Sequence, residues 1–207
     1  MSINPLESKI NSGQFINMME LVPARDLDLD AQINKLKSIN NIEFFGVVDS
    51  PLSRPMMSPI ALCHKIEMAG RTSIMHLVCR DRNLIALEAD VLAAYALGIK
   101  NILALTGDPV RNAKGVFEFS SIGLIDFIQK LNLKKSINCF VGEGINTNAK
   151  FMENEIKRTI DKIGAGAKYV ITQPCFDIKK IEKTCDAVSA PIIAGVIPVF
   201  EVKTAEF

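Results

Sequence analysis

The chain has 207 residues and a mass of 22.7 kDa, a size typical of one domain. Hydrophobic residues make up 48% of it and charged residues 23%, which excludes wholesale disorder. The 24 basic and 23 acidic residues nearly balance, so nucleic acid is not an expected partner. Because no apolar run reaches the ~20 residues of a membrane span, and residues 1–14 carry no signal-peptide core, we expect a cytoplasmic protein without a membrane partner.

Seven short apolar runs, rich in Val, Ile, Phe and Leu, recur along the chain. Continuous runs of this length are typical of strands that are buried on both faces of a parallel sheet. The predicted strands cover residues 15–22, 44–49, 73–79, 101–106, 136–141, 169–173 and 192–199.

Amphipathic stretches between these runs predict helices. Ser58 followed by Pro59 is a typical helix start, and Gly98 is a typical residue after a helix end. In the fifth interval, apolar residues recur with helical spacing and predict one buried helix face. That predicted face consists of Met152, Ile156, Ile160 and Ile163.

The polar or special residues that end these strands recur every 25 to 35 residues. They are Glu20, Asp49, Cys79, Asp108, Glu143, Gln173 and Pro198. This period is typical of a repeated strand–helix unit. Since the chain lacks a G-x-G-x-x-G turn, the pattern favours a (β/α)8 TIM barrel, within the α/β class, over an open dinucleotide-binding sheet.

Only seven such units are present, and residues 203–207 read as the start of a seventh helix. A complete barrel typically needs about 250 residues. We therefore expect a single barrel domain over residues 1–207 that is truncated after the seventh strand. A seven-stranded open barrel, or closure by a partner chain, are the alternatives. Open parallel edges would leave the isolated chain poorly stable or oligomeric.

In a barrel, chemistry takes place at the carboxyl ends of the strands. Glu20 lies in an apolar strand end, where desolvation would raise its pKa and suit it to act as a general acid. Gln173 offers a neutral amide at the sixth strand end, and Gly107 allows close backbone approach to a flat ligand. A lone acidic residue after a strand is more often a helix cap or a turn former than a catalyst.

Other kinds of site are not indicated. Five cysteines form no C-x-x-C pair, and His64 and His76 are the only histidines. We therefore expect neither a disulfide framework nor a metal site. The chain contains no G-x-S-x-G nucleophile motif and no P-loop.

Six short segments, in this order and at this spacing, resemble the methylenetetrahydrofolate reductase family of flavin-dependent barrel enzymes. They are residues 19–25, 76–81, 104–109, 164–168, 171–177 and 195–199. The resemblance covers essentially the whole chain, and its pattern is closest to the short bacterial type. It implies reduction of 5,10-methylenetetrahydrofolate to 5-methyltetrahydrofolate, with flavin reduced first by a donor such as NADH.

The resemblance also implies roles for individual residues. Glu20 matches the catalytic acid that protonates the folate. Asp108 matches an acid beside the flavin that also contacts the pterin, and Gln173 matches an amide that binds the pterin. The positions that match flavin contacts are Asp49, His76, Thr106, Gly107, Asp108, Asn146, Ala149 and Lys162.

The expected cofactor is FAD rather than FMN, although several departures leave that choice open. Thr106 stands where some members carry arginine, and Asn146 stands where some carry histidine. Arg158 and Asp161 replace asparagine and arginine of those members in the helix after the fifth strand. Two other functions remain open: a non-catalytic flavin- or folate-binding subunit, and a pterin-binding barrel methyltransferase. The expected assembly is a homo-oligomer or a subunit of a complex.

Overall fold

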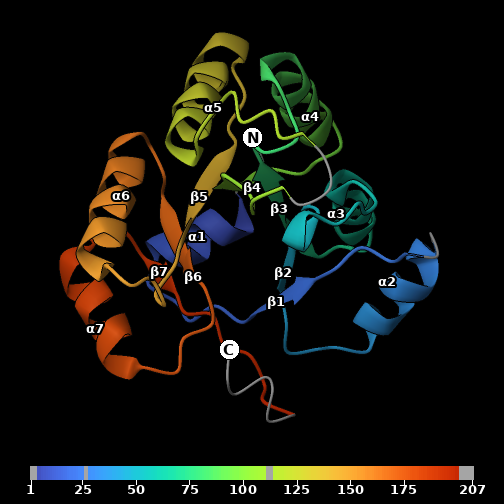
Figure 1. Cartoon of the computed structure of the whole chain (residues 1–207). Coiled ribbons are helices and arrows are strands. Elements are labelled where there is room, and N and C mark those ends of the chain that lie inside the picture. The colour runs from blue at the N-terminus through green and yellow to red at the C-terminus, as the bar shows by residue number, and fades with distance from the viewer. Residues whose placement is uncertain (1–3, 26–27, 111–113, 201–207) are drawn as a thin grey trace.

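The computed structural model describes residues 4–25, 28–110 and 114–200, and its centre is a curled parallel sheet of seven strands (Figure 1). The strands are β1 Met18–Leu21, β2 Phe44–Val47, β3 Thr72–Val78, β4 Asn101–Leu105, β5 Phe140–Ile145, β6 Tyr169–Thr172 and β7 Ile192–Ile193. Each strand pairs in parallel with the next one along the chain. This order confirms the predicted α/β class and the barrel-type succession of strands.

Helices α2 to α7 connect the strands and cover the outer face of the curled sheet, and α1 precedes the first strand (Figure 1). They are α1 Pro5–Asn11, α2 Leu29–Lys37, α3 Pro59–Met68, α4 Leu84–Ala96, α5 Ser121–Lys135, α6 Met152–Gly164 and α7 Ile178–Ala187, with a 3-10 turn, η1, at Pro51–Ser53. None of the helices within the described ranges is long and apolar enough to cross a membrane. The predicted helix start at 203–207 lies outside the described residues.

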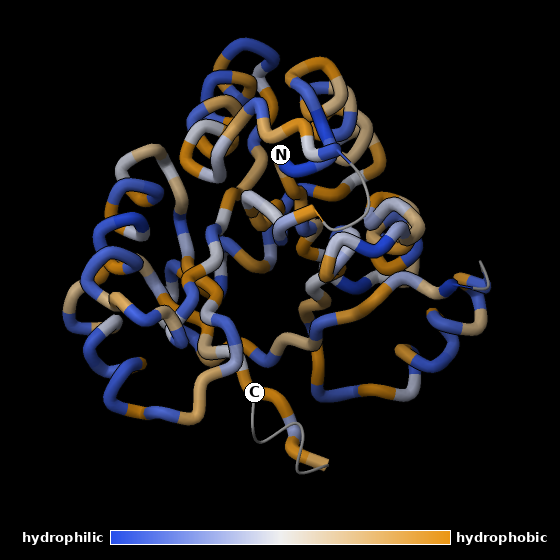
Figure 2. Tube along the Cα trace, in the orientation of Figure 1, coloured by the Kyte–Doolittle hydropathy of each residue, from blue (hydrophilic) through white to orange (hydrophobic). Residues whose placement is uncertain are grey.

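Two apolar layers result from the alternation of side chains along the strands. The outer layer packs between the sheet and the helices, and includes Phe45, Met75 and Val141. The inner layer fills the concave side of the sheet, and includes Phe44, Ile74 and Tyr169. Figure 2 shows apolar residues along the strands, while hydrophilic residues dominate the outer sides of several helices.

Helix α1 covers the amino-terminal end of the inner layer. Its Leu6 and Ile10 are buried among the inner side chains. Before the helix, the buried Asn4 donates from Nδ2 to Asn101 Oδ1 at 2.8 Å, and accepts from the Leu6 amide at 3.1 Å. This hydrogen bonding joins α1 to β4 and leaves the opposite, carboxyl end of the strands as the place for a ligand.

Three predicted strands differ most from the structure. β1 begins at Met18 and not at Phe15, which is 82% exposed. β5 begins at Phe140 and not at Ser136, because Ser136 ends α5 in a left-handed conformation with φ 53°. The side chain of Asn132 then bonds the amide and carbonyl of Cys139, which holds the connection as a turn. β7 pairs only at Ile192 and Ile193, so its predicted continuation to Val199 is wrong.

The predicted buried face of α6 is partly wrong. Ile160 is 49% exposed, whereas Thr159 and Lys162 are buried beside Met152 and Ile156. The buried lysine is accommodated because an acidic side chain of β5 lies opposite it, as described below. Apolar spacing alone gives no sign of such a pair.

Candidate active site

Glu20, Gly46 and His76 lie on three neighbouring strands, on the concave side of the sheet. Each follows, by two residues, a side chain of the inner layer: Met18, Phe44 and Ile74, respectively. In the register of the sheet, Glu20 pairs directly with Gly46. A carboxyl, a position without a side chain and an imidazole therefore follow one another across the mouth of the barrel.

The electrostatic state of Glu20 agrees with the expectation for a general acid. Its side chain reaches solvent, yet the surrounding protein atoms desolvate the charged form and raise the pKa of the carboxyl. It can therefore exchange protons with a ligand while holding its own proton to a higher pH than an ordinary glutamate. Its catalytic role remains a prediction.

His76 is a buried histidine whose Nε2 has no hydrogen-bond partner among the described residues. Burial lowers the pKa of His76 to about 4, so the ring is neutral near pH 7. A Cβ at Gly46 would lie 3.1 Å from this Nε2. Because Gly46 has no side chain, the imidazole of His76 can occupy this space.

The loop after β4 brings Asp108 against the loop after β2. Asp108 Oδ2 accepts a hydrogen bond from the amide of Leu52 at 2.7 Å. Gly107 has φ 92°, and a Cβ there would lie 2.9 Å from Arg80 Cβ, so both conformation and packing require glycine. Thr106 Oγ1 accepts from the amide of Ser121, which connects this loop to α5.

Asp49 is engaged with the protein itself. Its Oδ2 lies 2.6 Å from Arg82 Nη1 and accepts from the Val78 amide at 3.1 Å. Arg82 also pairs with Asp90 at 2.7 Å. These contacts tie β2, β3 and α4 together beside the mouth. The Asp49 carboxylate is therefore already paired within the protein, and a flavin at the mouth would not meet it as a free anion.

Arg80 is a buried cation at this end of β3 to which the sequence analysis assigned no role. It is 1% exposed, donates from Nη2 to the carbonyl of Ser50 at 3.0 Å, and pairs with Asp81. Its Nη1 has no partner among the described residues. The signal in the sequence was its place directly after the strand, inside the segment 76–81 that also contains His76.

Gln173, Asn146 and Ala149 lie at the carboxyl ends of β5 and β6. Gln173 is exposed, and its backbone amide donates to Ile145 O at 2.9 Å. Ala149 donates to Asn146 O at 3.1 Å, and Asn146 Oδ1 accepts from the Asn148 amide at 2.9 Å. The binding roles predicted for these residues remain predictions.

Lys162 lies behind the sheet, between α6 and β5. It is 3% exposed, and its Nζ lies 2.6 Å from both Glu143 Oε2 and the carbonyl of Gly144. Burial raises the pKa of the Glu143 carboxyl, and the Lys162 ammonium counteracts that shift. The contacts give Lys162 a structural partner, so its predicted contact with flavin phosphates stays a prediction.

The structure thus brings Glu20, His76, Asp108 and Gln173 to one end of the sheet, and places Lys162 on its outer side. Within the ranges the structure describes, no group of three or more His, Cys, Asp or Glu side chains is placed to hold a metal ion.

The curled parallel sheet defines a barrel-type α/β protein. In this class the active site lies at the carboxyl ends of the strands, where the desolvated carboxyl of Glu20 is found. A comparison with protein-family models matches residues 6–207 to the family described as methylenetetrahydrofolate reductase. The chain belongs to the methylenetetrahydrofolate reductase family, which confirms the resemblance read from the sequence.

Individual relatives agree. Methylenetetrahydrofolate reductase 2 of Saccharomyces cerevisiae is 29% identical over 150 residues, covering 63% of this chain and 24% of that protein. 5,10-methylenetetrahydrofolate reductase of Buchnera aphidicola subsp. Schizaphis graminum is 24% identical over 191 residues, covering 87% of this chain and 64% of that protein. The chain thus spans about a quarter of the yeast relative and under two thirds of the bacterial one.

Solved structures share the fold at low identity. 2,3-dimethylmalate lyase, a PEP mutase/isocitrate lyase superfamily member, aligns with a TM-score of 0.69 and 8% identity, over 97% of this chain and 76% of that chain. Phosphonopyruvate hydrolase aligns with a TM-score of 0.65 and 13% identity, over 97% and 73%. These likenesses concern the fold alone.

Proposed function

We propose that this chain carries the folate-reducing site of a flavin-dependent methylenetetrahydrofolate reductase, with FAD as the flavin and NADH as a suitable donor. The observation that carries the proposal is the placement of Glu20, with its raised pKa, in register with Gly46. Gly46 in turn lies against His76, whose Nε2 has no partner among the described residues. Family membership supplies the substrate class, a reduced folate.

The mouth of the barrel fits a flat, neutral-to-anionic ring system. Among the described residues, the buried Nε2 of the neutral His76 has no hydrogen-bond partner, and Gly46 beside it carries no side chain. His76, Thr106, Gly107 and Asp108 would hold the ring, with Asp49, Asn146, Ala149 and Lys162 as the other predicted contacts. When bound, the flavin supplies the hydride that reduces the folate.

The chain's own residues would then handle protons and orientation. Glu20 would donate a proton to the folate amine, so that the methylene bridge opens to a reactive iminium. Gln173 would orient the pterin through its side-chain amide. Asp108 would contact the pterin while its carboxylate, fixed by the Leu52 amide, lies beside the flavin.

The proposal is tested by incubating the purified full-length protein with FAD or FMN and recording the flavin absorbance after gel filtration. Retained flavin that NADH bleaches and methylenetetrahydrofolate restores would support the assigned function. A protein that stays colourless yet binds the folate would contradict it, and would favour a pterin-binding methyltransferase.

Replacing Asp108 with asparagine is expected to raise the reduction potential of bound flavin by about 30 mV or more, equivalent to about 1.4 kcal/mol for two electrons. A carboxylate disfavours the negative charge of the reduced ring, and asparagine removes that charge. Because asparagine keeps an acceptor for the Leu52 amide, the loop should survive. Potentiometric titration measures the effect. An unchanged potential would indicate that Asp108 only stabilises the turn and does not act on the flavin.

Replacing Gly46 with alanine is expected to weaken flavin binding by up to about tenfold. The new Cβ would press on His76 Nε2 from 3.1 Å, and moving the ring off its rotamer costs about 0.5–1.5 kcal/mol. Gly164→Ala is the matched control, because a Cβ there meets nothing within 4 Å. Flavin fluorescence quenching gives both dissociation constants; equal values for the two variants would contradict a role for Gly46 in placing His76.

A further inference from the structure

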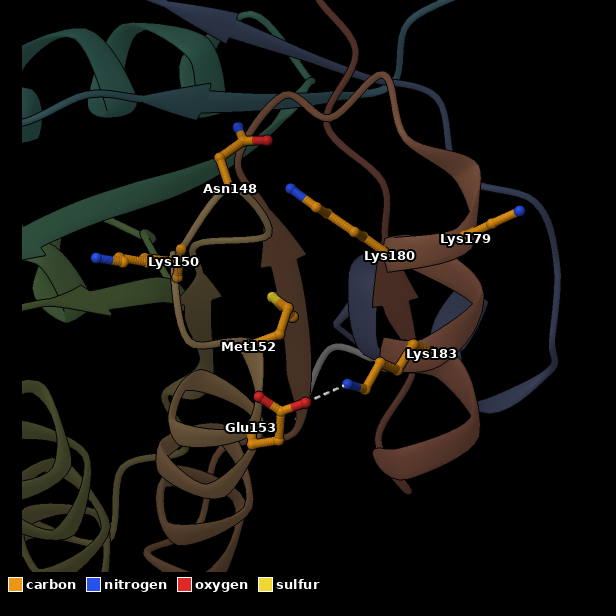
Figure 3. Close-up of a pocket in the computed structure, with 8 residues that line it drawn as sticks. Asn148, Lys150, Met152, Glu153, Lys179, Lys180 and Lys183 are labelled. Carbon is orange, nitrogen blue, oxygen red and sulfur yellow. Dashed lines mark hydrogen bonds and ion pairs between the residues drawn. The ribbon is translucent and has the colours of Figure 1, made fainter.

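A pocket of about 480 Å³ lies between the first turns of α6 and α7, beside the loop after β5 (Figure 3). We call it the lysine pocket. Its lining consists of Asn148, Ala149, Lys150, Met152, Glu153, Lys179, Lys180 and Lys183.

The charges of the lysine pocket do not balance. Four lysines line it, but Glu153 is its one acidic residue, and that carboxylate pairs with Lys183 across the two helices. Three positive charges remain on Lys150, Lys179 and Lys180. Lys150 lies 5.5 Å from the ring centroid of Phe151, and no ion pair of Lys179 or Lys180 exists within the described ranges.

Lys180 is the cation that points into this space. In Figure 3 its side chain extends from α7 toward Asn148, whereas Lys150 and Lys179 point to either side. Lys180 is also half-buried, while the other three lysines of the pocket are exposed. Asn148 is held in place, since its Nδ2 donates to Pro174 O at 2.8 Å.

The backbone adds to the positive potential. Both α6 and α7 direct their amino-terminal ends, the positive ends of their dipoles, at the lysine pocket. Helix α6 begins without a side-chain cap, whereas Asp177 caps α7 by accepting from the Lys179 amide at 3.1 Å. The pocket therefore combines a half-buried ammonium, a fixed amide and the uncapped end of α6, which together match a carboxylate or a phosphate.

The lysine pocket also adjoins the candidate active site. Asn148 bonds to Pro174, the residue after Gln173, and its amide bonds to Asn146. Ala149, a predicted flavin contact, forms part of the lining. A ligand that reacts at the barrel mouth can therefore reach this pocket with a charged extension.

We propose that the lysine pocket binds the anionic end of a ligand whose other end lies at the barrel mouth. The shared chemistry is a carboxylate or phosphate group, and it has two sources. One is the chain of glutamates carried by a folate; the other is the diphosphate of a dinucleotide. The choice of ligand rests on the proposed function, but the anion site itself does not.

The test measures binding of tri-γ-glutamate and of inorganic pyrophosphate to the full chain by isothermal titration calorimetry at low salt. We expect saturable binding of one probe, which names the source. Lys180→Gln should weaken it about tenfold, as expected for the loss of one charge-assisted hydrogen bond. Lys157→Gln, which removes an equal charge from an exposed site on α6 outside the pocket, should leave it unchanged.

Three results would overturn the inference: no saturable binding of either probe, equal losses in the two variants, or binding that survives 0.5 M salt undiminished. Circular dichroism of both variants establishes that they are folded. If flavin and folate fail to bind while Lys180 still governs probe binding, the proposed function falls and the anion site stands.

Discussion

Replacing Glu20 with glutamine is expected to slow folate reduction about 10²–10⁴-fold, the usual contribution of a general acid. In the proposed mechanism, only opening of the methylene bridge needs a proton from Glu20, so reduction of the flavin by its donor should be spared. Stopped-flow absorbance of the flavin separates the two half-reactions. Equal losses in both would indicate a folding or flavin-binding defect, and an unaffected folate half-reaction would remove Glu20 from the mechanism.

The pH dependence gives a second measurement of the same residue. Desolvation raises the pKa of Glu20, so the protonated acid persists above the pH range of an ordinary glutamate. The folate half-reaction should therefore fall as pH rises through that raised value. In Glu20→Gln the slow residual rate should lose this dependence. Gln14→Glu, which adds an exposed carboxyl between α1 and β1, should keep it.

Replacing Lys162 with methionine is expected to destabilise the protein by about 3–5 kcal/mol, because it leaves Glu143 buried without its partner. For a chain of this size that corresponds to a fall in Tm of roughly 10 °C. Adding Glu143→Leu should recover much of the loss, since a buried ion pair replaced by apolar groups is often neutral. Thermal melts of the single and double variants measure this coupling; strictly additive losses would contradict it.

The loss in Lys162→Met should grow with pH. Burial raises the pKa of Glu143 in the folded chain, and removing the Lys162 ammonium raises it further. Between the unfolded and folded pKa values, the folded protein then binds more protons than the unfolded chain, so stability falls as pH rises. Thermal melts at pH 5 and pH 8 check the sign.

A separate measurement on Lys162→Met tests its predicted contact with flavin phosphates. Weaker FAD binding with unchanged FMN binding would support that contact.

Much of the fold could be predicted because its signals are local. Apolar runs and the regular spacing of residues such as Glu20, Asp49 and Asp108 indicated parallel strands in chain order, and the structure confirms that order. Pro59 and Gly98 marked a helix start and a helix end because their backbone preferences act within one turn. The start of β5 was misplaced, since the left-handed Ser136 and the side-chain bonds of Asn132 leave no apolar pattern.

The sequence by itself determined the alternation of strands and helices, the family, and the polar residues at the strand ends, because periodicity and short motifs are properties of the chain. Only the tertiary structure decided which of those residues meet a partner within the protein. Asp49 and Lys162 meet ion-pair partners, Arg82 and Glu143, that lie 33 and 19 residues away along the chain. His76 lies beside Gly46, on another strand, with a nitrogen that has no partner in the described part of the chain. Such pairings arise from strand register and helix packing, which bring distant side chains together and which no local pattern records.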